Sequence, residues 1–195
     1  MEVARRVLVW ARMSRRMFVA AVIAVAASGS AAVAGPYVGL GIGNSSVSDS
    51  TNNYLPDGRS GRLMLGTRFG NISAEGAFTG YGLIQRNGAN GGLVDARSLS
   101  GALKLSIPLG NNFEGFARGG LIRTWLSPQS DARMPTYSGD GYTFSAGFEY
   151  RLNLIVAGTS LFVDYTHNSA NLTADKFKSI DQTTSLWTLG LTVSI

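Results

Sequence analysis

The chain has 195 residues, of which 45% are hydrophobic, 10% aromatic and only 15% charged. An ordinary soluble domain carries about 25% charged residues, and a chain this apolar can bury a core, which excludes intrinsic disorder. Cysteine is absent and histidine occurs once, which excludes a disulfide scaffold, a cysteine nucleophile and a thiolate or multi-histidine metal site. We expect no metal and no cofactor.

The positive charge of the chain is concentrated at its amino end. Residues 1–34 hold five arginines and one glutamate, so the remaining chain carries 12 basic and 11 acidic side chains. No basic cluster remains there that could bind a run of phosphates. The sequence therefore predicts no binding of nucleic acid.

The first segment of the chain has the pattern of a secretory signal peptide. Two adjacent arginines precede an apolar run over residues 17–27, and the small residues that follow fit the cleavage rule at Ala34. A membrane-spanning helix needs about 20 apolar residues, so an uncleaved anchor is the less favoured alternative. We expect a cleaved helical signal peptide over residues 1–34 and a mature domain over residues 35–195.

Hydrophobic and polar residues alternate with a period of two through the mature chain, which is the pattern of half-buried β-strands. Leu103 and Leu105, for example, share one face of a strand, and Lys104 lies on the other. The predicted strands cover residues 37–43, 62–69, 72–82, 98–107, 113–125, 142–152, 161–167 and 185–195.

The connections between these strands alternate in length. The short connections cover residues 70–71, 108–112 and 153–158, and the long connections, rich in Ser, Asn, Asp and Gly, cover residues 44–60, 83–97, 126–140 and 168–184. An antiparallel up-and-down sheet places alternate connections at opposite ends, so one end has short turns and the other has four long loops. This arrangement is typical of outer-membrane barrels.

The two faces of each strand distinguish a membrane barrel from a soluble one. Aromatic residues lie near the strand ends, as expected for interfacial girdles: Trp125, Tyr142 and Trp187 near the long loops, and Phe69, Phe113 and Tyr150 near the short turns. The polar face carries charges of both signs, at Arg62, Arg68, Glu75, Lys104, Glu114, Arg118, Glu149, Arg151 and Asp164.

Eight strands leave a lumen just wide enough for side chains. We therefore expect the charges of the polar face to fill this lumen with a stabilising network of ion pairs, in preference to lining a narrow ion path. The predicted fold is an all-β, eight-stranded, antiparallel up-and-down transmembrane β-barrel. The alternative is a soluble periplasmic barrel that binds a small ligand.

Several strands resemble those of the OmpA-like outer-membrane barrel family. The segments SAGFEYRL at 145–152, SLFVDYT at 160–166 and WTLGL at 187–191 are similar to its last three strands, and LGTRF at 65–69 is similar to its second. The glycines at positions 39, 41 and 43 resemble its first strand. The resemblance implies a structural protein of a Gram-negative outer membrane, without catalysis, surrounded by membrane lipid and lipopolysaccharide. Its four loops would be adhesive or would bind an extracellular partner.

The last strand also resembles the assembly signal of outer-membrane barrels, in which a polar residue and a glycine precede two hydrophobic residues. The matching positions are Thr188, Gly190, Val193 and Ile195, and Ile195 stands where those barrels usually end in phenylalanine. This resemblance implies the barrel assembly machinery as a partner.

A second resemblance implies an alternative function. His167-Asn168-Ser169 is similar to the His-x-Ser motif of the lipid A 3-O-deacylase barrels, and Asp181 follows roughly a dozen residues later. In that family the serine attacks the ester, the histidine takes its proton and the acid orients the imidazole. The alternation of the strand places His167 on the lipid-facing side. Ala170 departs from the family, which has asparagine directly after the serine.

Overall fold

The computed structural model describes residues 34–49, 58–85, 93–128, 136–152, 158–174 and 179–195. The expected signal peptide lies outside the described residues, except for Ala34, which begins the first strand. The strands are β1 (Ala34–Asp49), β2 (Gly58–Phe69), β3 (Ile72–Gln85), β4 (Leu93–Pro108), β5 (Phe113–Pro128), β6 (Tyr137–Arg151), β7 (Thr159–Thr173) and β8 (Ile180–Ser194). Within these segments, no helix is long and apolar enough to cross a membrane.

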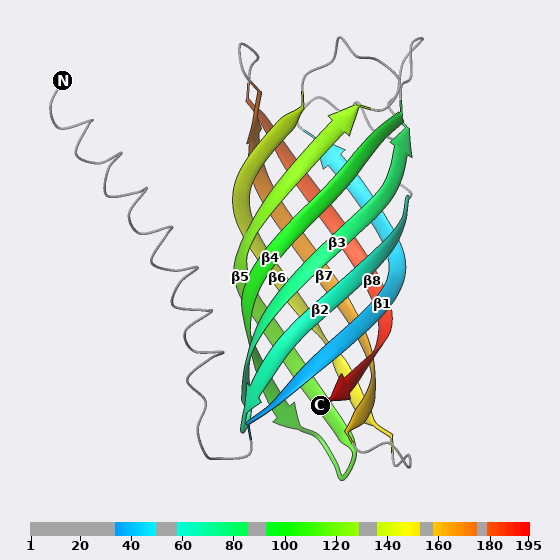
Figure 1. Cartoon of the computed structure of the whole chain (residues 1–195), viewed down its shortest axis with the longest axis vertical. Helices are drawn as coiled ribbons and strands as arrows, with labels where there is room; N and C mark the ends of the chain where they lie inside the picture. The colour runs from blue at the N-terminus through cyan, green and yellow to red at the C-terminus, as the bar shows by residue number, and fades with distance from the viewer. Residues whose placement is uncertain (1–33, 50–57, 86–92, 129–135, 153–157, 175–178) are drawn as a thin grey trace, which may run out of the picture.

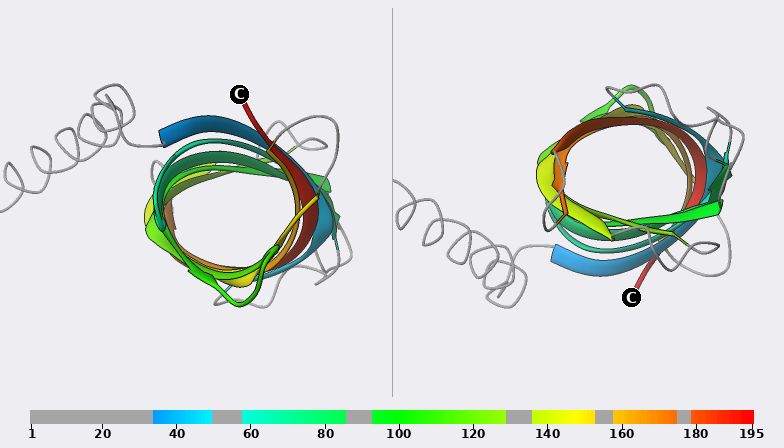
Figure 2. Two further views of the ribbon diagram at one scale, coloured as in Figure 1. Left: turned by 90° about the horizontal axis from the view of Figure 1, so that it is seen from below. Right: turned by 90° about the horizontal axis from the view of Figure 1, so that it is seen from above.

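The eight strands form one closed barrel (Figures 1 and 2). Each strand pairs antiparallel with its neighbour in the sequence, and β1 closes the barrel against β8. Closure gives every strand a partner on both sides, which satisfies the backbone groups that a sheet edge would leave open. The predicted eight-stranded, antiparallel up-and-down barrel is confirmed.

The connections lie at the two ends as their lengths predict. The short connections lie at the end where the described chain begins and ends, which we call the short-turn end (Figure 1). The tightest of them places Gly70 at a φ of 61°, a left-handed conformation that glycine adopts without strain. The four connections that the sequence predicts to be long join the strands at the opposite end, which we call the long-loop end.

The strands extend further toward the long-loop end than the sequence predicts. β1 continues to Asp49, and Ser45 and Val47 still pair with Leu186 and Thr184 of β8. The long connections predicted at 44–60, 83–97, 126–140 and 168–184 are therefore partly strand. Their Ser, Thr and Asn content reflects contact with water, and small polar side chains do not prevent pairing of the backbone.

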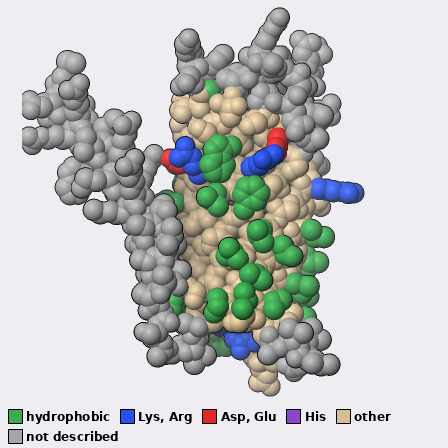
Figure 3. Space-filling model, viewed as in Figure 1, with side chains coloured by type: hydrophobic (Ala, Val, Ile, Leu, Met, Phe, Trp, Pro, Cys, Tyr) green, Lys and Arg blue, Asp and Glu red, His purple; other side chains and the backbone are tan. Residues whose placement is uncertain are grey.

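The outer wall and the lumen have opposite polarity over most of the barrel. Large apolar side chains point outward and are exposed, including Leu65 (59%), Leu103 (55%) and Leu189 (52%), whereas charged side chains are buried inside. Figure 3 shows such apolar side chains spread over one face of the wall. This is the reverse of a soluble barrel, so the alternative of a soluble periplasmic barrel is wrong.

The polarity reverses at the long-loop end. There the lumen holds a cluster of buried apolar side chains, which we call the apolar plug: Val47, Tyr81, Val94, Ala96, Leu126, Ala170, Leu172 and Leu186. At the same end Ser46, Ser48 and Thr173 are exposed on the outside of the wall. The barrel thus has an apolar outer wall and a polar lumen over most of its length, and a polar outer wall with an apolar lumen in a short zone at the long-loop end.

Candidate functional site

The centre of the lumen is built around Arg118, which β5 holds with only 2% of its surface exposed. Its Nε lies 2.6 Å from Oε2 of Glu75, and its Nη1 pairs with Oδ2 of Asp164. Asp164 also pairs with Arg62, with 3.3 Å between Oδ2 and Nη1. These four side chains from β2, β3, β5 and β7 form what we call the central ion cluster.

Neighbouring side chains hold this cluster in place. The Arg118 guanidinium lies 4.3 Å from the centre of the Phe116 ring, a cation–π contact between two buried side chains. Thr166 accepts a hydrogen bond from Arg62 at 3.3 Å and donates one to Ser145 at 3.0 Å. Charges this deeply buried are tolerable only with such partners.

Lys104 links the central ion cluster to the short-turn end. Its Nζ pairs with Glu149 and lies 3.9 Å from Oε1 of Glu75. The Tyr37 hydroxyl donates a hydrogen bond to Glu75, and Thr192 donates one to Glu149 at 3.4 Å. Each carboxylate therefore meets a cation and a hydroxyl group.

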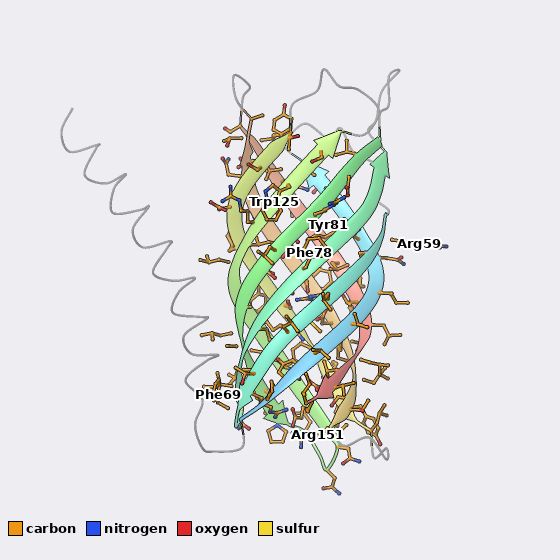
Figure 4. The ribbon with its side chains drawn as sticks, in the orientation of Figure 1. Arg59, Phe69, Phe78, Tyr81, Trp125 and Arg151 are labelled. Carbon is orange, nitrogen blue, oxygen red and sulfur yellow. The ribbon has the colours of Figure 1, made fainter. Side chains whose placement is uncertain are left out.

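The mouth of the lumen is formed by Arg68, Glu114 and Arg151. Nη1 of Arg68 lies 2.9 Å from Oε2 of Glu114, and Nη2 of Arg151 pairs with Oε1 of the same carboxylate. Arg68 also donates a hydrogen bond from Nε to the carbonyl of Gly70 at 2.8 Å, which ties the mouth to the first short turn. A cavity of about 700 Å³ opens here, with Lys104 and Glu149 in its lining. Figure 4 shows Arg151 at this end of the barrel.

Above the central ion cluster the lumen contains neutral side chains. Tyr81 shares a 2.9 Å hydrogen bond with Ser98 and accepts one from Asn168 at 3.0 Å. The apolar plug follows. From one end to the other, the described lumen is therefore occupied by a charged mouth, an ion cluster, a neutral polar layer and an apolar plug.

The structure brings all nine predicted polar-face charges into ion pairs within one lumen. Arg68 is half-buried and Arg151 is exposed at the mouth, and the other seven are buried. Sequence reasoning missed the hydroxyl partners Tyr37, Thr166 and Thr192. The alternation along each strand places these three residues on the inner face, but their contacts depend on the register between strands.

The residues of the deacylase alternative do not form a triad. His167 and Ser169 lie half-buried on the outward face of β7, but Asp181 lies opposite Asn171 and accepts its hydrogen bond at 2.7 Å. His167 lies opposite Ser185, four residues further along β8 than Asp181. At about 3.3 Å per residue, the acid is about 13 Å along the strand from the position opposite the histidine.

The residues of the expected assembly signal have different surroundings. Thr188 and Gly190 face the lumen, Val193 is half-buried, and Ile195 is 79% exposed. A side chain at Gly190 would place its Cβ 2.5 Å from the Phe162 ring, so this glycine is needed for packing of the lumen. Recognition of this strand by the assembly machinery stays a prediction.

A metal site is not evident in this part of the molecule: the described segments hold no cluster of three or more His, Cys, Asp or Glu side chains arranged to bind an ion. The acidic side chains of the lumen are engaged by arginine and lysine. What the lumen offers chemically is a set of neutralised charges, which serves stability better than catalysis.

Comparisons with known proteins agree with this architecture. Residues 17–194 match the family model described as the outer membrane protein beta-barrel domain. Neisserial surface protein A is similar in structure, with a TM-score of 0.66, 15% identity, and coverage of 84% of this chain and 100% of that chain. No curated protein matches the sequence.

Two further solved structures share the fold. The N-terminal β-barrel domain of Pseudomonas aeruginosa OprF has a TM-score of 0.53 and 10% identity over 82% of this chain and 97% of that one. Ail, the attachment invasion locus protein of Yersinia pestis, has a TM-score of 0.51 and 13% identity over 81% of this chain and 98% of that one. At these identities the likeness is one of fold.

Proposed function

The chain belongs to the outer membrane protein beta-barrel domain family, and from this premise we propose that it is a structural protein that presents its long-loop end outside the cell as a binding surface. The observation that carries the proposal is the occupied lumen. The central ion cluster and the apolar plug fill the interior at two levels. The surface that remains for an extracellular partner is therefore the outside of the barrel and its long-loop end, since the cavity beside Lys104 and Glu149 opens at the short-turn end.

The proposal includes the route to the membrane. A signal peptide over residues 1–34 would direct export, and the barrel assembly machinery would insert the mature domain, residues 35–195, with the short-turn end in the periplasm. The short turns at residues 70–71 and 109–112 support this orientation, because outer-membrane barrels carry their short turns on the periplasmic side. A name such as attachment invasion locus protein, borne by the similar Ail structure, favours an adhesive role for this end.

The orientation is tested by placing a short peptide tag between Asp49 and Gly58, or in the turn between Pro108 and Phe113 as the matched control. We expect an antibody to label intact cells only when the tag lies between Asp49 and Gly58. Labelling of intact cells through the Pro108–Phe113 turn alone would reverse the orientation and overturn the proposal.

The binding role is tested on cells that carry the wild-type chain or a variant with residues 50–57, 86–92, 129–135 and 175–178 replaced by Gly-Ser segments. We expect the wild-type cells to adhere more strongly to epithelial cells and immobilised matrix proteins, and the variant cells to lose this gain. Heat-dependent gel mobility would verify that both barrels are folded. Equal adhesion by both would contradict a binding role for this end.

The deacylase alternative has one observation in its favour, the shared outward face of His167 and Ser169. Because Asp181 is hydrogen-bonded to Asn171, we expect lipid A to keep all its acyl chains in cells that make the wild-type chain. Mass spectrometry of lipid A from cells with wild-type protein, Ser169→Ala protein or no protein checks this. Loss of one acyl chain with the wild type alone would establish the enzyme and overturn our choice.

A further inference from the structure

Arginine side chains gather on one part of the outer wall, at the boundary between the apolar band and the polar zone of the long-loop end. Arg59 of β2, Arg97 of β4 and Arg123 of β5 are all exposed there. Figure 3 shows basic side chains at this height, with hydrophobic side chains between and below them. Figure 4 shows Arg59 pointing away from the barrel.

The acidic side chains nearby do not cancel this charge. Arg97 pairs with Asp95, and Arg123 lies 3.8 Å from Asp140. Arg59 has no ion pair with any other residue in the described segments. Among the described residues on this part of the wall, three cations and two carboxylates leave a positive charge toward the outside.

A bare patch of wall lies between two of the arginines. Gly61 and Gly80 are cross-strand partners, and Gly80 is also the partner of Arg97. A Cβ added at either glycine would meet no atom within 4 Å, so no side chain fills the space above them. Neighbouring strands are about 4.8 Å apart and residues along a strand about 3.3 Å apart. Arg97 lies two strands from Gly61, and Arg59 lies two residues beyond Gly61, so the backbones of Arg59 and Arg97 are about 12 Å apart on either side of β3.

The next outward-facing row toward the short-turn end is apolar. It consists of Leu63, Phe78 and Leu99, which pair in that order and are about half exposed. Trp125, the partner of Arg97, borders the patch on the other side. One outward-facing row thus holds the two bare glycines beside Arg97, Arg59 lies two residues further toward the long-loop end, and the apolar row lies on the other side of the glycines.

We propose that this patch binds the phosphorylated glycolipid of the outer leaflet, through the lipid A part of lipopolysaccharide. Guanidinium groups bind phosphate oxygens in bidentate geometry, so Arg59 and Arg97 hold the phosphates. The glycine surface leaves room for the sugar rings. The acyl chains lie along Leu63, Phe78 and Leu99. The inference rests on the proposed orientation, in which this level of the wall meets the lipid headgroups.

The test uses the full mature barrel in detergent or nanodiscs and bisphosphorylated lipid A as the probe. Native mass spectrometry measures the affinity for this lipid, for lipid A stripped of phosphates, for phosphatidylglycerol and for inorganic phosphate. We expect selective binding of bisphosphorylated lipid A, weakened about tenfold or more, or about 1.4 kcal/mol, by Arg59→Gln combined with Arg97→Gln. Arg151→Gln removes a positive charge at the opposite end and should leave the affinity unchanged.

A second variant tests the bare patch at Gly61 and Gly80 without removing a charge. Gly80→Leu fills the bare patch, and since its side chain points into open space, the barrel should keep its stability while its affinity for lipid A falls. Equal affinity for phosphate-free lipid A, equal affinity for inorganic phosphate or phosphatidylglycerol, or an equal loss in Arg151→Gln would overturn the site. The tag experiment on intact cells reports the orientation independently, so failure of the lipid site is distinguishable from failure of the proposed function.

Discussion

Arg118→Gln is expected to lower the free energy of unfolding by about 3–5 kcal/mol, because it removes one partner from a buried ion network. Without the guanidinium, Glu75 loses its 2.6 Å contact, and Asp164 keeps the longer 3.3 Å ion pair with Arg62 and a 3.4 Å hydrogen bond from Thr166. Two buried carboxylates, 3% and 1% exposed, then lose most of their charge compensation. Urea unfolding of the barrel in lipid vesicles, followed by tryptophan fluorescence, measures the loss.

The matched control is the same substitution at Arg97, which pairs with Asp95 on the outer wall and is 60% exposed in its side chain. An exposed pair contributes about 0–1 kcal/mol, so Arg97→Gln should change the unfolding free energy little. Arg118→Lys keeps the charge but not the forked guanidinium that reaches both carboxylates. Its loss of unfolding free energy should lie between those of Arg118→Gln and Arg97→Gln. If Arg118→Gln and Arg97→Gln were equally mild, the central ion cluster would not be a major source of stability.

Leu103→Arg is the second substitution with a large expected effect. Leu103 lies on the outer wall of β4 between the apolar Leu99 and Ile107, near the middle of the apolar band, and is 55% exposed. An arginine on the lipid face at the bilayer midplane costs about 2–4 kcal/mol. We expect a loss of this size in vesicle unfolding, together with slower membrane insertion.

Ser48→Arg is the control for Leu103→Arg, since Ser48 is exposed on the outer wall within the polar zone of β1. A charge near or beyond the interface costs about 0–1 kcal/mol. Equal losses at the two positions would mean that the apolar band does not face hydrocarbon. The pair of variants therefore measures where the membrane begins along the wall.

The fold could be predicted because its two signals are local. Alternation along a strand needs only the residues of that strand, and the lengths of the connections are read directly from the sequence. Lys104 and Glu149 could both be assigned to the inner face by parity alone. That they pair with each other depends on how β4, β5 and β6 are staggered around the barrel.

Contacts across the lumen could not be predicted from the sequence. Arg118 and Asp164 lie on β5 and β7, which are not neighbours in the sheet, and they meet only because the barrel closes. The spacing of Ser169 and Asp181 in the chain suggested a catalytic group, but the register of β7 and β8 places Asn171 opposite Asp181. Spacing along the chain does not determine which residues face each other across a hairpin.

The strand ends were mispredicted for a different reason. Segments such as residues 44–49 are rich in serine and were expected to be loop, yet they continue β1. Their serine content reflects the contact of their outward-facing side chains with water. Their inner positions, such as Val47, carry the apolar plug, and this weak alternation was the signal available for a longer strand.

The apolar plug has a consequence for how the protein could diversify. It anchors the strand ends from inside, using side chains such as Leu126, Leu172 and Leu186 that belong to the strands. The apolar plug therefore holds the strand ends, from which the four connections leave, at a fixed spacing. In the orientation that we propose, peptides grafted between Asp49 and Gly58, or into any of the other three connections, would change what the cell displays while the scaffold beneath them stayed the same.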